Sequence, residues 1–192
     1  MVGETNWLAP VRWTGDGLTI RVYSIEDAEE LSRAVNESYE HLKPWMPWAN
    51  MNQTVIQSEQ ISRRLIASYH DNSDYTMGIW DGDTLIGGTG FHLRCGPIEW
   101  KAAEIGMWIR SSYAGKGWGT RSLEQMLTWG FEVWGWERLT WKCDTRNEGS
   151  IRVAEKCGLT REATFLSDAL DVEAKRRDSH QYVMLKANWS KR

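Results

Sequence analysis

Three glycines at alternate positions, Gly115, Gly117 and Gly119, form the part of the chain best suited to hold a phosphorylated ligand. Glycine adopts positive φ without a Cβ penalty and lets backbone N–H groups approach a ligand closely. Such N–H groups form an anion site, and a helix that begins there adds its dipole and its unpaired donors. Lys116 adds a positive charge. By itself the turn fits phosphate binding and a ligand-free strand-to-helix turn about equally well.

Hydrophobic periodicity predicts the elements that position this turn. Apolar side chains alternate over residues 101–110, which indicates a strand. Beyond the glycines they recur at helical spacing, which predicts an amphipathic helix over 117–134. Alternation over 138–143 predicts a second strand, and Asn147 is then the N-cap of a helix over 148–157.

Ser150 falls on the inner face of this second helix, together with Val153, Ala154 and Cys157. One interpretation is a helix-start hydroxyl that bonds to the nearby backbone. The other is a hydroxyl that points inward, toward a ligand held by the glycine turn. The residues alone slightly favour the first interpretation and leave the second open.

Residues 101–160 resemble the core of the GNAT acyltransferase superfamily, and specifically its RimJ/RimL branch of N-acetyltransferases. The segments that carry the resemblance are 104–109 (EIGMWI), 115–119 (GKGWG) and 147–150 (NEGS). The chain departs from the branch at Ala114, where Gln or Arg is usual. This departure removes one side-chain contact to phosphate and leaves the backbone N–H groups intact. Two smaller departures are Met107 for an aromatic residue and Leu159 for Phe.

The resemblance implies one domain over residues 1–192 with an α+β fold, in which helices flank a twisted, mixed and mostly antiparallel sheet. A length of 192 residues with 41% hydrophobic content suits a single core, and the chain contains no linker or repeat. The periodicity predicts the elements in this order: strand 18–23, helix 25–41, helix 54–69, strand 75–80, strand 84–93, strand 101–110, helix 117–134, strand 138–143, helix 148–157, strand 161–167 and strand 178–186.

The resemblance also implies acetyl-CoA as co-substrate and no metal ion. Similarity to the family assigns its binding to the strand, the glycine turn and the second helix, at Met107, Trp108, Ile109, Gly115, Lys116, Gly117, Trp118, Gly119, Thr120, Asn147 and Ser150. The implied activity is acetyl transfer to a primary amine, which attacks the thioester directly in a ternary complex. Backbone N–H groups near residues 107–109 would then stabilise the oxyanion. The acceptor is a protein N-terminus or a small molecule such as an antibiotic or an aminoacyl compound.

One candidate acid and two candidate bases could take part in catalysis. In the branch that the chain resembles, the hydroxyl at the position of Ser150 is thought to protonate the departing CoA thiolate. Many other family members use a Tyr at the place that is Ala154 here. Glu104 lies on the strand where an acid often acts as general base, although a carboxylate there can equally be structural. Asp168 is a second candidate base.

The acceptor pocket is expected beside residues 42–48, which resemble the loop that walls this pocket in the family. Trp45 and Trp48 are its aromatic side chains, and Asp168 is assigned to the same pocket. A plain hydrophobic lid over the core explains these residues about equally well. Three further tryptophans are expected to pack in the core or at its edge: Trp129, Trp134 and Trp141.

Composition limits the location and the partners of the protein. A net charge of −3 and a pI of about 5.9 argue against broad electrostatic binding of nucleic acid. Residues 1–10 lack the basic and apolar regions of a secretory leader, and no apolar run is long enough to cross a membrane, so we expect neither export nor a membrane span. Cys95, Cys143 and Cys157 lack metal-site spacing, so we expect structural thiols in a cytoplasmic protein. A homodimer is expected from the family only.

Two other functions remain open at this point. A non-catalytic acyl-CoA sensor would keep the glycine turn and dispense with Ser150 and a base. A dinucleotide-binding oxidoreductase domain would place the glycines on pyrophosphate and Asp144 on a ribose hydroxyl. The second is disfavoured because position 120 is not glycine and too little sequence follows for a doubly wound sheet.

Overall fold

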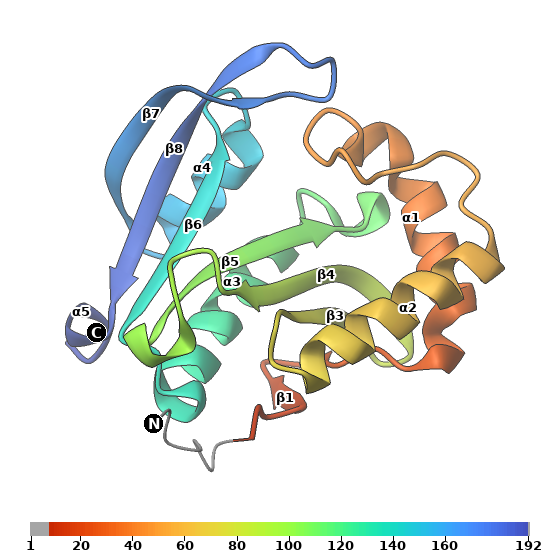
Figure 1. Ribbon diagram of the computed structural model, residues 1–192, viewed down its shortest axis with the longest axis horizontal. Helices are drawn as coiled ribbons and strands as arrows, with labels where there is room; N and C mark the ends of the chain where they lie inside the picture. Colours follow the sequence, from red (N-terminus) through yellow and green to blue (C-terminus); the bar gives the residue numbers. More distant parts are fainter. Residues whose placement is uncertain (1–7, 192) are drawn as a thin grey trace.

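A computed structural model describes residues 8–191, and within them eight strands form one sheet (Figure 1). The strand order is β1-β2-β3-β4-β5-β6-β8-β7. Each neighbouring pair is antiparallel except β5 and β6, which run parallel. The strands are β1 (Arg12–Gly15), β2 (Leu18–Arg21), β3 (Tyr75–Asp81), β4 (Thr84–His92), β5 (Ala102–Ile109), β6 (Arg138–Asp144), β7 (Thr160–Leu170) and β8 (Arg176–Leu185).

Helices cover both faces of the sheet, which confirms the predicted α+β fold. The helices are α1 (Ala28–Leu42), α2 (Val55–His70), α3 (Trp118–Trp129), α4 (Glu148–Lys156) and the short α5 (Lys186–Trp189). Ile79 and Ile86 pack into the core beneath α3, whereas their neighbours Trp80 and Leu85 pack into the core beneath α1. This alternation is the one that a strand imposes on successive side chains.

Local sequence explains where the helices on the α1 face begin. Thr54 and Gln57 form a capping box at α2, in which each side chain accepts a hydrogen bond from the other residue's backbone N–H. Ser24 and Asp27 form the same arrangement ahead of α1, and Arg21 pairs with Asp27 at 2.7 Å. The N-terminus of each helix is therefore fixed by side-chain hydrogen bonds that include at least one residue ahead of the helix.

The predicted elements recur with shifted boundaries and one change of geometry. The helix expected over 117–134 is α-helical only to Trp129 and continues as a π-helical turn, Gly130–Trp134. Gly130 lies against the sheet, because a Cβ there would be 2.8 Å from Leu139 Cδ1. The wider turn lets both Phe131 and Trp134 face inward, where they are buried. β1, the far end of β7 and α5 were not predicted.

An aromatic cluster around Trp134 fills the core beneath α3. Its ring lies 4.8 Å from that of Tyr75, 4.9 Å from that of Phe91 and 5.5 Å from that of Trp129, measured between centroids. Trp129, Trp134 and Trp141 are at most 5% exposed, which confirms the core placement expected for them. None of the helices in residues 8–191 has the length and apolar character needed to span a membrane.

We expect Trp134→Ala to lower the free energy of unfolding by about 3–5 kcal/mol, because it removes a buried ring and leaves a cavity among aromatic neighbours. The matched control is Trp100→Ala, since Trp100 is 68% exposed. That change should stay within about 0.5 kcal/mol of the unsubstituted protein. Urea denaturation followed by far-UV circular dichroism measures both. Equal losses in the two variants would contradict the position of Trp134 in the core.

Candidate active site

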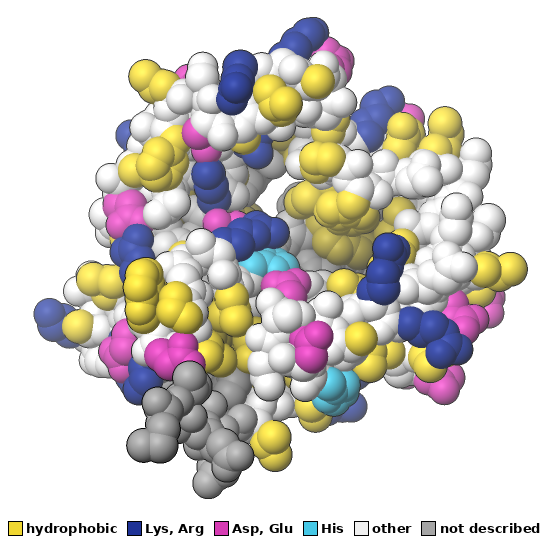
Figure 2. Space-filling view, viewed as in Figure 1, with side chains coloured by type: hydrophobic (Ala, Val, Ile, Leu, Met, Phe, Trp, Pro, Cys, Tyr) yellow, Lys and Arg dark blue, Asp and Glu magenta, His cyan; other side chains and the backbone are white. Residues whose placement is uncertain are grey.

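A cleft opens where β5 and β6 separate. The two strands pair only from Ala102 opposite Arg138 to Glu104 opposite Thr140, and then diverge, as the green and cyan ribbons in Figure 1 show. The cleft has a volume of about 1100 Å³. Figure 2 shows the hollow, with hydrophobic side chains on one side and charged and histidine side chains on the other. Most of the site residues predicted from the sequence line this cleft.

The backbone of β5 presents free hydrogen-bonding groups to the cleft. Arg110 N–H donates to Ile86 O at 2.8 Å, so this residue points its backbone toward β4. The carbonyl of Trp108 faces β4 as well, because a Cβ on Gly87 would lie 2.2 Å from it. Backbone groups alternate in direction along a strand, so those of Met107 and Ile109 face the gap toward β6. Both residues lie beyond the last β5–β6 pair.

The glycine turn borders the cleft and leads into α3. Gly115 and Gly117 have φ of 72° and 87°, and a Cβ on either would meet nothing within 4 Å. Glycine is therefore required there by backbone conformation. The first helical hydrogen bond runs from Arg121 N–H to Gly117 O, so the N–H groups of residues 117–120 have no acceptor within the helix. The turn thus has the donors and the helix N-terminus of an anion site.

Gly119 serves a different purpose from the other two glycines. Its Cβ would lie 3.3 Å from Val153 Cγ2, so its absence lets α3 pack closely against α4. Lys116 and Trp118 direct their side chains away from the cleft. Lys116 Nζ donates to Ser112 O at 2.7 Å, and Trp118 packs against Tyr113 and the Arg121 guanidinium. Neither residue lines the cleft.

Ser150 points its hydroxyl into the cleft from the first turn of α4. Asn147 caps this helix by accepting the Ser150 N–H at 3.0 Å, so the Ser150 hydroxyl is not needed as a cap. Trp141 Nε1 donates to Ser150 Oγ at 2.8 Å and fixes one of its acceptor positions. The hydroxyl proton is directed to the sulfur of Cys143, a weak acceptor that a stronger acceptor in the cleft could replace. The structure therefore supports the inward interpretation of Ser150, which the residues alone did not favour.

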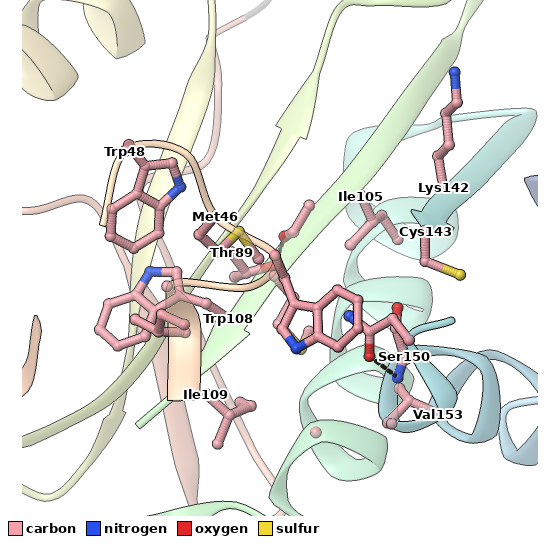
Figure 3. Close-up of a pocket in the computed structure, with 18 of the residues that line it drawn as sticks. Met46, Trp48, Thr89, Ile105, Trp108, Ile109, Lys142, Cys143, Ser150 and Val153 are labelled. Carbon is pink, nitrogen blue, oxygen red and sulfur yellow. Dashed lines mark hydrogen bonds between the residues drawn. The ribbon is translucent and has the colours of Figure 1, made fainter. Parts of the chain in front are cut away.

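Cys143 lies beside Ser150 at the same wall of the cleft (Figure 3). Burial raises the pKa of its thiol, and a hydrogen bond from the Ser150 hydroxyl only partly offsets this effect. The thiol therefore stays protonated at neutral pH. Cys143 is buried, as expected for a structural thiol, but its side chain also borders the cleft.

Aromatic side chains form the opposite wall. Trp45 and Trp48 come from the loop after α1, and both line the cleft as expected. The ring of Trp48 stands edge-on to that of Trp108, with centroids 5.8 Å apart (Figure 3). Trp108 lies flat across β4 because position 88 is glycine; a Cβ on Gly88 would be 2.3 Å from Trp108 Nε1. Trp48 remains 47% exposed, so this wall is open to a ligand.

Both carboxylates proposed as general base are held in ion pairs. Glu104 lines the cleft and is paired with Arg94. Asp168, on β7, pairs with Lys142 at 2.6 Å and is not among the residues that line the cleft. Burial acts to raise the pKa of Asp168, but hydrogen bonds from Lys142 and Ser179 outweigh it and the pKa is lowered. A paired carboxylate with a lowered pKa is a poor proton acceptor at neutral pH.

Two residues in the cleft were missed from the sequence. His92 ends β4 and Asp74 precedes β3, and the atoms His92 Nδ1 and Asp74 Oδ1 lie 2.7 Å apart. The β3–β4 hairpin brings them together across 18 residues of sequence. The sequence offered one signal for this pair: Asp74 and His92 lie at the open end of a predicted hairpin, one at the start of its first strand and one at the end of its second. Among residues 8–191 no group of His, Cys, Asp and Glu is arranged to hold a metal ion.

Comparisons with known proteins agree with this geometry. The family "Acetyltransferase (GNAT) domain" matches residues 17–160. The "Putative ribosomal N-acetyltransferase YdaF" of Bacillus subtilis (strain 168) is 28% identical over 173 residues, which cover 90% of this chain and 93% of the relative.

Solved structures share the fold. The ribosomal-protein-S5-alanine acetyltransferase from Vibrio fischeri has a TM-score of 0.81 at 20% identity, and covers 94% of this chain and 99% of its own. The microcin C7 self immunity acetyltransferase MccE, in complex with acetyl-CoA and AMP, has a TM-score of 0.80 at 21% identity, with coverage of 89% and 93%.

The alternative of a dinucleotide-binding oxidoreductase is wrong. That fold needs a largely parallel sheet, whereas β5 and β6 form the single parallel pair among the strands described. The glycine turn, the open strand edge and the inward hydroxyl instead agree with the family match, which spans most of the sequence. The chain therefore belongs to the acetyltransferase (GNAT) domain family.

Proposed function

We propose that the protein transfers the acetyl group of acetyl-CoA to a primary amine by direct attack in a ternary complex. The observation that carries this proposal is the gap between β5 and β6. On one side it exposes the backbone of Met107 and Ile109, and on the other the hydroxyl of Ser150. A thioester placed in this gap would meet hydrogen-bond donors at its carbonyl oxygen and a proton donor at its sulfur.

The residues around the gap suit CoA. The open, positive-φ glycines Gly115 and Gly117 and the N-terminus of α3 offer N–H groups to a pyrophosphate. Arg152 and Lys156 of α4 also line the cleft and add positive charge. The free edge of β5 offers backbone groups to an extended, amide-containing arm. The fit thus depends on backbone donors, which explains why Ala114 can replace the usual Gln or Arg.

The chemistry follows from what each group can donate. The amine nitrogen attacks the thioester carbon, and negative charge develops on the carbonyl oxygen. N–H groups of Met107 and Ile109 are positioned to stabilise that oxyanion. The C–S bond then breaks, and Ser150 gives its hydroxyl proton to the thiolate while it regains one from the acetylated nitrogen. The non-catalytic sensor does not account for a hydroxyl that opens into the gap, so we do not favour it.

The acceptor must carry its amine past the aromatic wall. Trp45, Trp48 and Trp108 favour an acceptor with a flat or apolar group next to the amine. YdaF and the Vibrio fischeri structure are named for ribosomal proteins, and MccE is named for microcin immunity. We therefore propose an exposed α-amino group of a protein, or a small molecule of similar shape, as the acceptor. Peptides that begin with alanine or serine and phenethylamine, each supplied with acetyl-CoA, test this choice through thiol release.

Location and assembly follow less directly. Cys95 and Cys143 form no disulfide, as a reducing compartment favours. We infer a cytoplasmic protein on this ground. A homodimer stays a prediction from the family.

We expect acetyl-CoA and CoA to stabilise the protein against heat, and NAD and NADP to have no effect. A ligand at about 100 times its Kd adds about 2.7 kcal/mol to the folded state. Gly115→Ala should weaken acetyl-CoA binding about tenfold or more, equivalent to about 1.4 kcal/mol, because its Cβ projects from the anion site.

The control for this variant is Gly135→Ala. Gly135 has φ of 74°, close to the 72° of Gly115, and a Cβ there also meets nothing within 4 Å. Both variants should lose about 1–2 kcal/mol of stability from backbone strain. Only Gly115→Ala should lose ligand stabilisation. Equal ligand responses in the two variants would remove the glycine turn from the binding site.

Ser150→Ala should lower kcat by about 10²-fold or more, with little change in KM for acetyl-CoA, because it removes the acid that protonates the leaving thiolate. Steady-state thiol release with the alanine peptide measures it. The variant also leaves Trp141 Nε1 without its acceptor, at a cost of about 1–3 kcal/mol. Thermal unfolding must therefore accompany the kinetics, and Ser190→Ala, at an exposed position, is the control. An unchanged kcat in a folded Ser150→Ala protein would refute the acid role.

A further inference from the structure

We propose that His92 is the general base that deprotonates the acceptor amine, and that Asp74 is the positioning residue that orients it. This inference rests on the proposed function of amine acetylation and deepens it. Its observations are the 2.7 Å contact between His92 Nδ1 and Asp74 Oδ1, the place of both residues in the cleft, and a slot between two glycines that holds the imidazole.

The β3–β4 hairpin positions Asp74 beside His92. Tyr75 opposite Phe91 is the last pair of the ladder, so Asp74 and His92 lie opposite each other one residue beyond it. Thr76 Oγ1 donates to Asp74 Oδ2 at 2.8 Å, which occupies the second carboxylate oxygen. Both oxygens of the Asp74 carboxylate are thus fixed, one by the imidazole of His92 and the other by the hydroxyl of Thr76.

The electrostatics fix the tautomer of His92. Burial acts to raise the pKa of Asp74, but hydrogen bonds from His92 and Thr76 and the charge of Arg94 outweigh it, and the pKa lies below its usual range. Asp74 is therefore ionised at neutral pH and can only accept a hydrogen bond. His92 Nδ1 must carry the proton of that bond. In the neutral imidazole Nε2 is then the unprotonated, basic nitrogen.

A facing pair of glycines makes room for the imidazole. Gly90 on β4 pairs with Gly106 on β5. A Cβ on Gly106 would lie 2.6 Å from His92 Nε2, and a Cβ on Gly90 would lie 3.2 Å from Cε1. The ring therefore lies across both strands with its Nε2 edge over β5. Its side chain is 14% exposed, so it is held in place and still reaches the cleft.

The position of Nε2 matches the place where the amine must lose its proton. Gly106 is the second residue of β5 beyond Glu104, where pairing with β6 ends, and it precedes Met107, whose backbone faces the gap. The face of β5 that carries Gly106 is also the face of Trp108, the aromatic wall of the acceptor pocket. His92 thus lies between the acceptor side of the cleft and the proposed site of the thioester carbonyl.

The surrounding charges leave His92 as the free base. Glu104 lies opposite His92 in the pairing of β4 with β5, but its carboxylate forms an ion pair with Arg94. Arg64 of α2 and Lys142 of β6 are cations that line the same cleft. Within residues 8–191 no hydrogen-bond partner contacts His92 Nε2. Of the cleft residues considered as base, His92 alone combines an orienting partner with an unoccupied basic atom.

The proton balance is complete. An ammonium acceptor gives one proton to His92 Nε2, directly or through one water, and becomes the nucleophilic amine. The amine forms the C–N bond, the C–S bond breaks, and the second nitrogen proton reaches the thiolate through Ser150. The imidazolium, stabilised by Asp74, then releases its proton to solvent. The net change is one acetylated amine, one CoA thiol and one proton.

A matched pair of acceptors tests the role of His92 directly. Phenethylamine is protonated at neutral pH and needs a base, whereas O-benzylhydroxylamine has nearly the same shape and is already unprotonated. For His92→Gln we expect kcat/KM to fall about 10²-fold or more with phenethylamine, as loss of a general base does. With O-benzylhydroxylamine the loss should stay below about tenfold.

Asp74→Asn should reproduce part of this loss and change the tautomer. Long-range proton–nitrogen NMR of His92 should show the Nδ1–H form in the wild type and a mixture of forms in Asp74→Asn. His70→Gln, on the exposed end of α2, should match the wild type in every measurement. The acetyl-CoA thermal shift should persist in all of these variants.

Each outcome separates the inference from the function on which it rests. Equal losses of His92→Gln with both acceptors, or an Nε2–H tautomer in the wild type, would overturn the base assignment while acetylation stands. A wild type that binds acetyl-CoA and acetylates neither amine nor either peptide would contradict the proposed function, and the base assignment with it. A His92→Gln protein without the acetyl-CoA shift would show that His92 supports the structure of the site instead.

Discussion

The early end of pairing between β5 and β6 is the constraint on which the rest of the structure depends. Unpaired backbone groups at a sheet edge are costly unless water or a ligand satisfies them. The two strands can separate because each is held firmly along its other edge. β5 pairs with β4 over six residues up to Ile109, and β6 pairs with β8 over seven residues up to Asp144. The gap is therefore a fixed feature with two exposed edges.

A buried ion cluster connects this gap to the acceptor wall. Arg110 follows β5 directly, its side chain is 8% exposed, and its guanidinium lies 2.6 Å from Glu30 and 2.5 Å from Glu37 on α1. The hydrogen bond from Arg110 holds the pKa of Glu37 below its usual range. Removing one partner of such a cluster typically costs about 3–5 kcal/mol, while its net stabilisation is small. Its main effect is geometric, because it fixes α1, and so the loop with Trp48, against the end of β5.

Sequence reasoning succeeded where the determinants were local. The alternation in 101–110 and the glycine spacing after it identified β5, the turn and α3, and the Asn147 cap placed Ser150 at the start of α4. It failed where the determinant was a tertiary contact. Even the side-chain direction at Lys116, which follows from a local bond to the carbonyl of Ser112 four residues earlier, is not specified by periodicity.

The same limit explains the two acidic candidates and the missed pair. Glu104 was correctly placed in the cleft, but its ion pair with Arg94 depends on the register of β4 against β5. The ion pair of Asp168 depends on the pairing of β7 with β8 and on the position of Lys142. The pairing of β7 with β8 also shifts register at two irregularities, which the sequence does not show. His92 and Asp74 meet only because the hairpin aligns their strand ends. A residue type at a strand end is visible in the sequence, while its partner is not.

The glycines of β4 and β5 show how the sheet accommodates the site. Glycine inside a strand weakens it, and often marks a close approach of another group. Gly88 makes room for the ring of Trp108, and Gly90 with Gly106 makes room for the ring of His92. β5 therefore presents three surfaces at once: apolar side chains toward α3, a side-chain-free patch toward the acceptor, and an open backbone edge toward β6. Glycine at these positions costs the sheet some stability. Without it, the rings of Trp108 and His92 could not lie against the sheet beside the open edge.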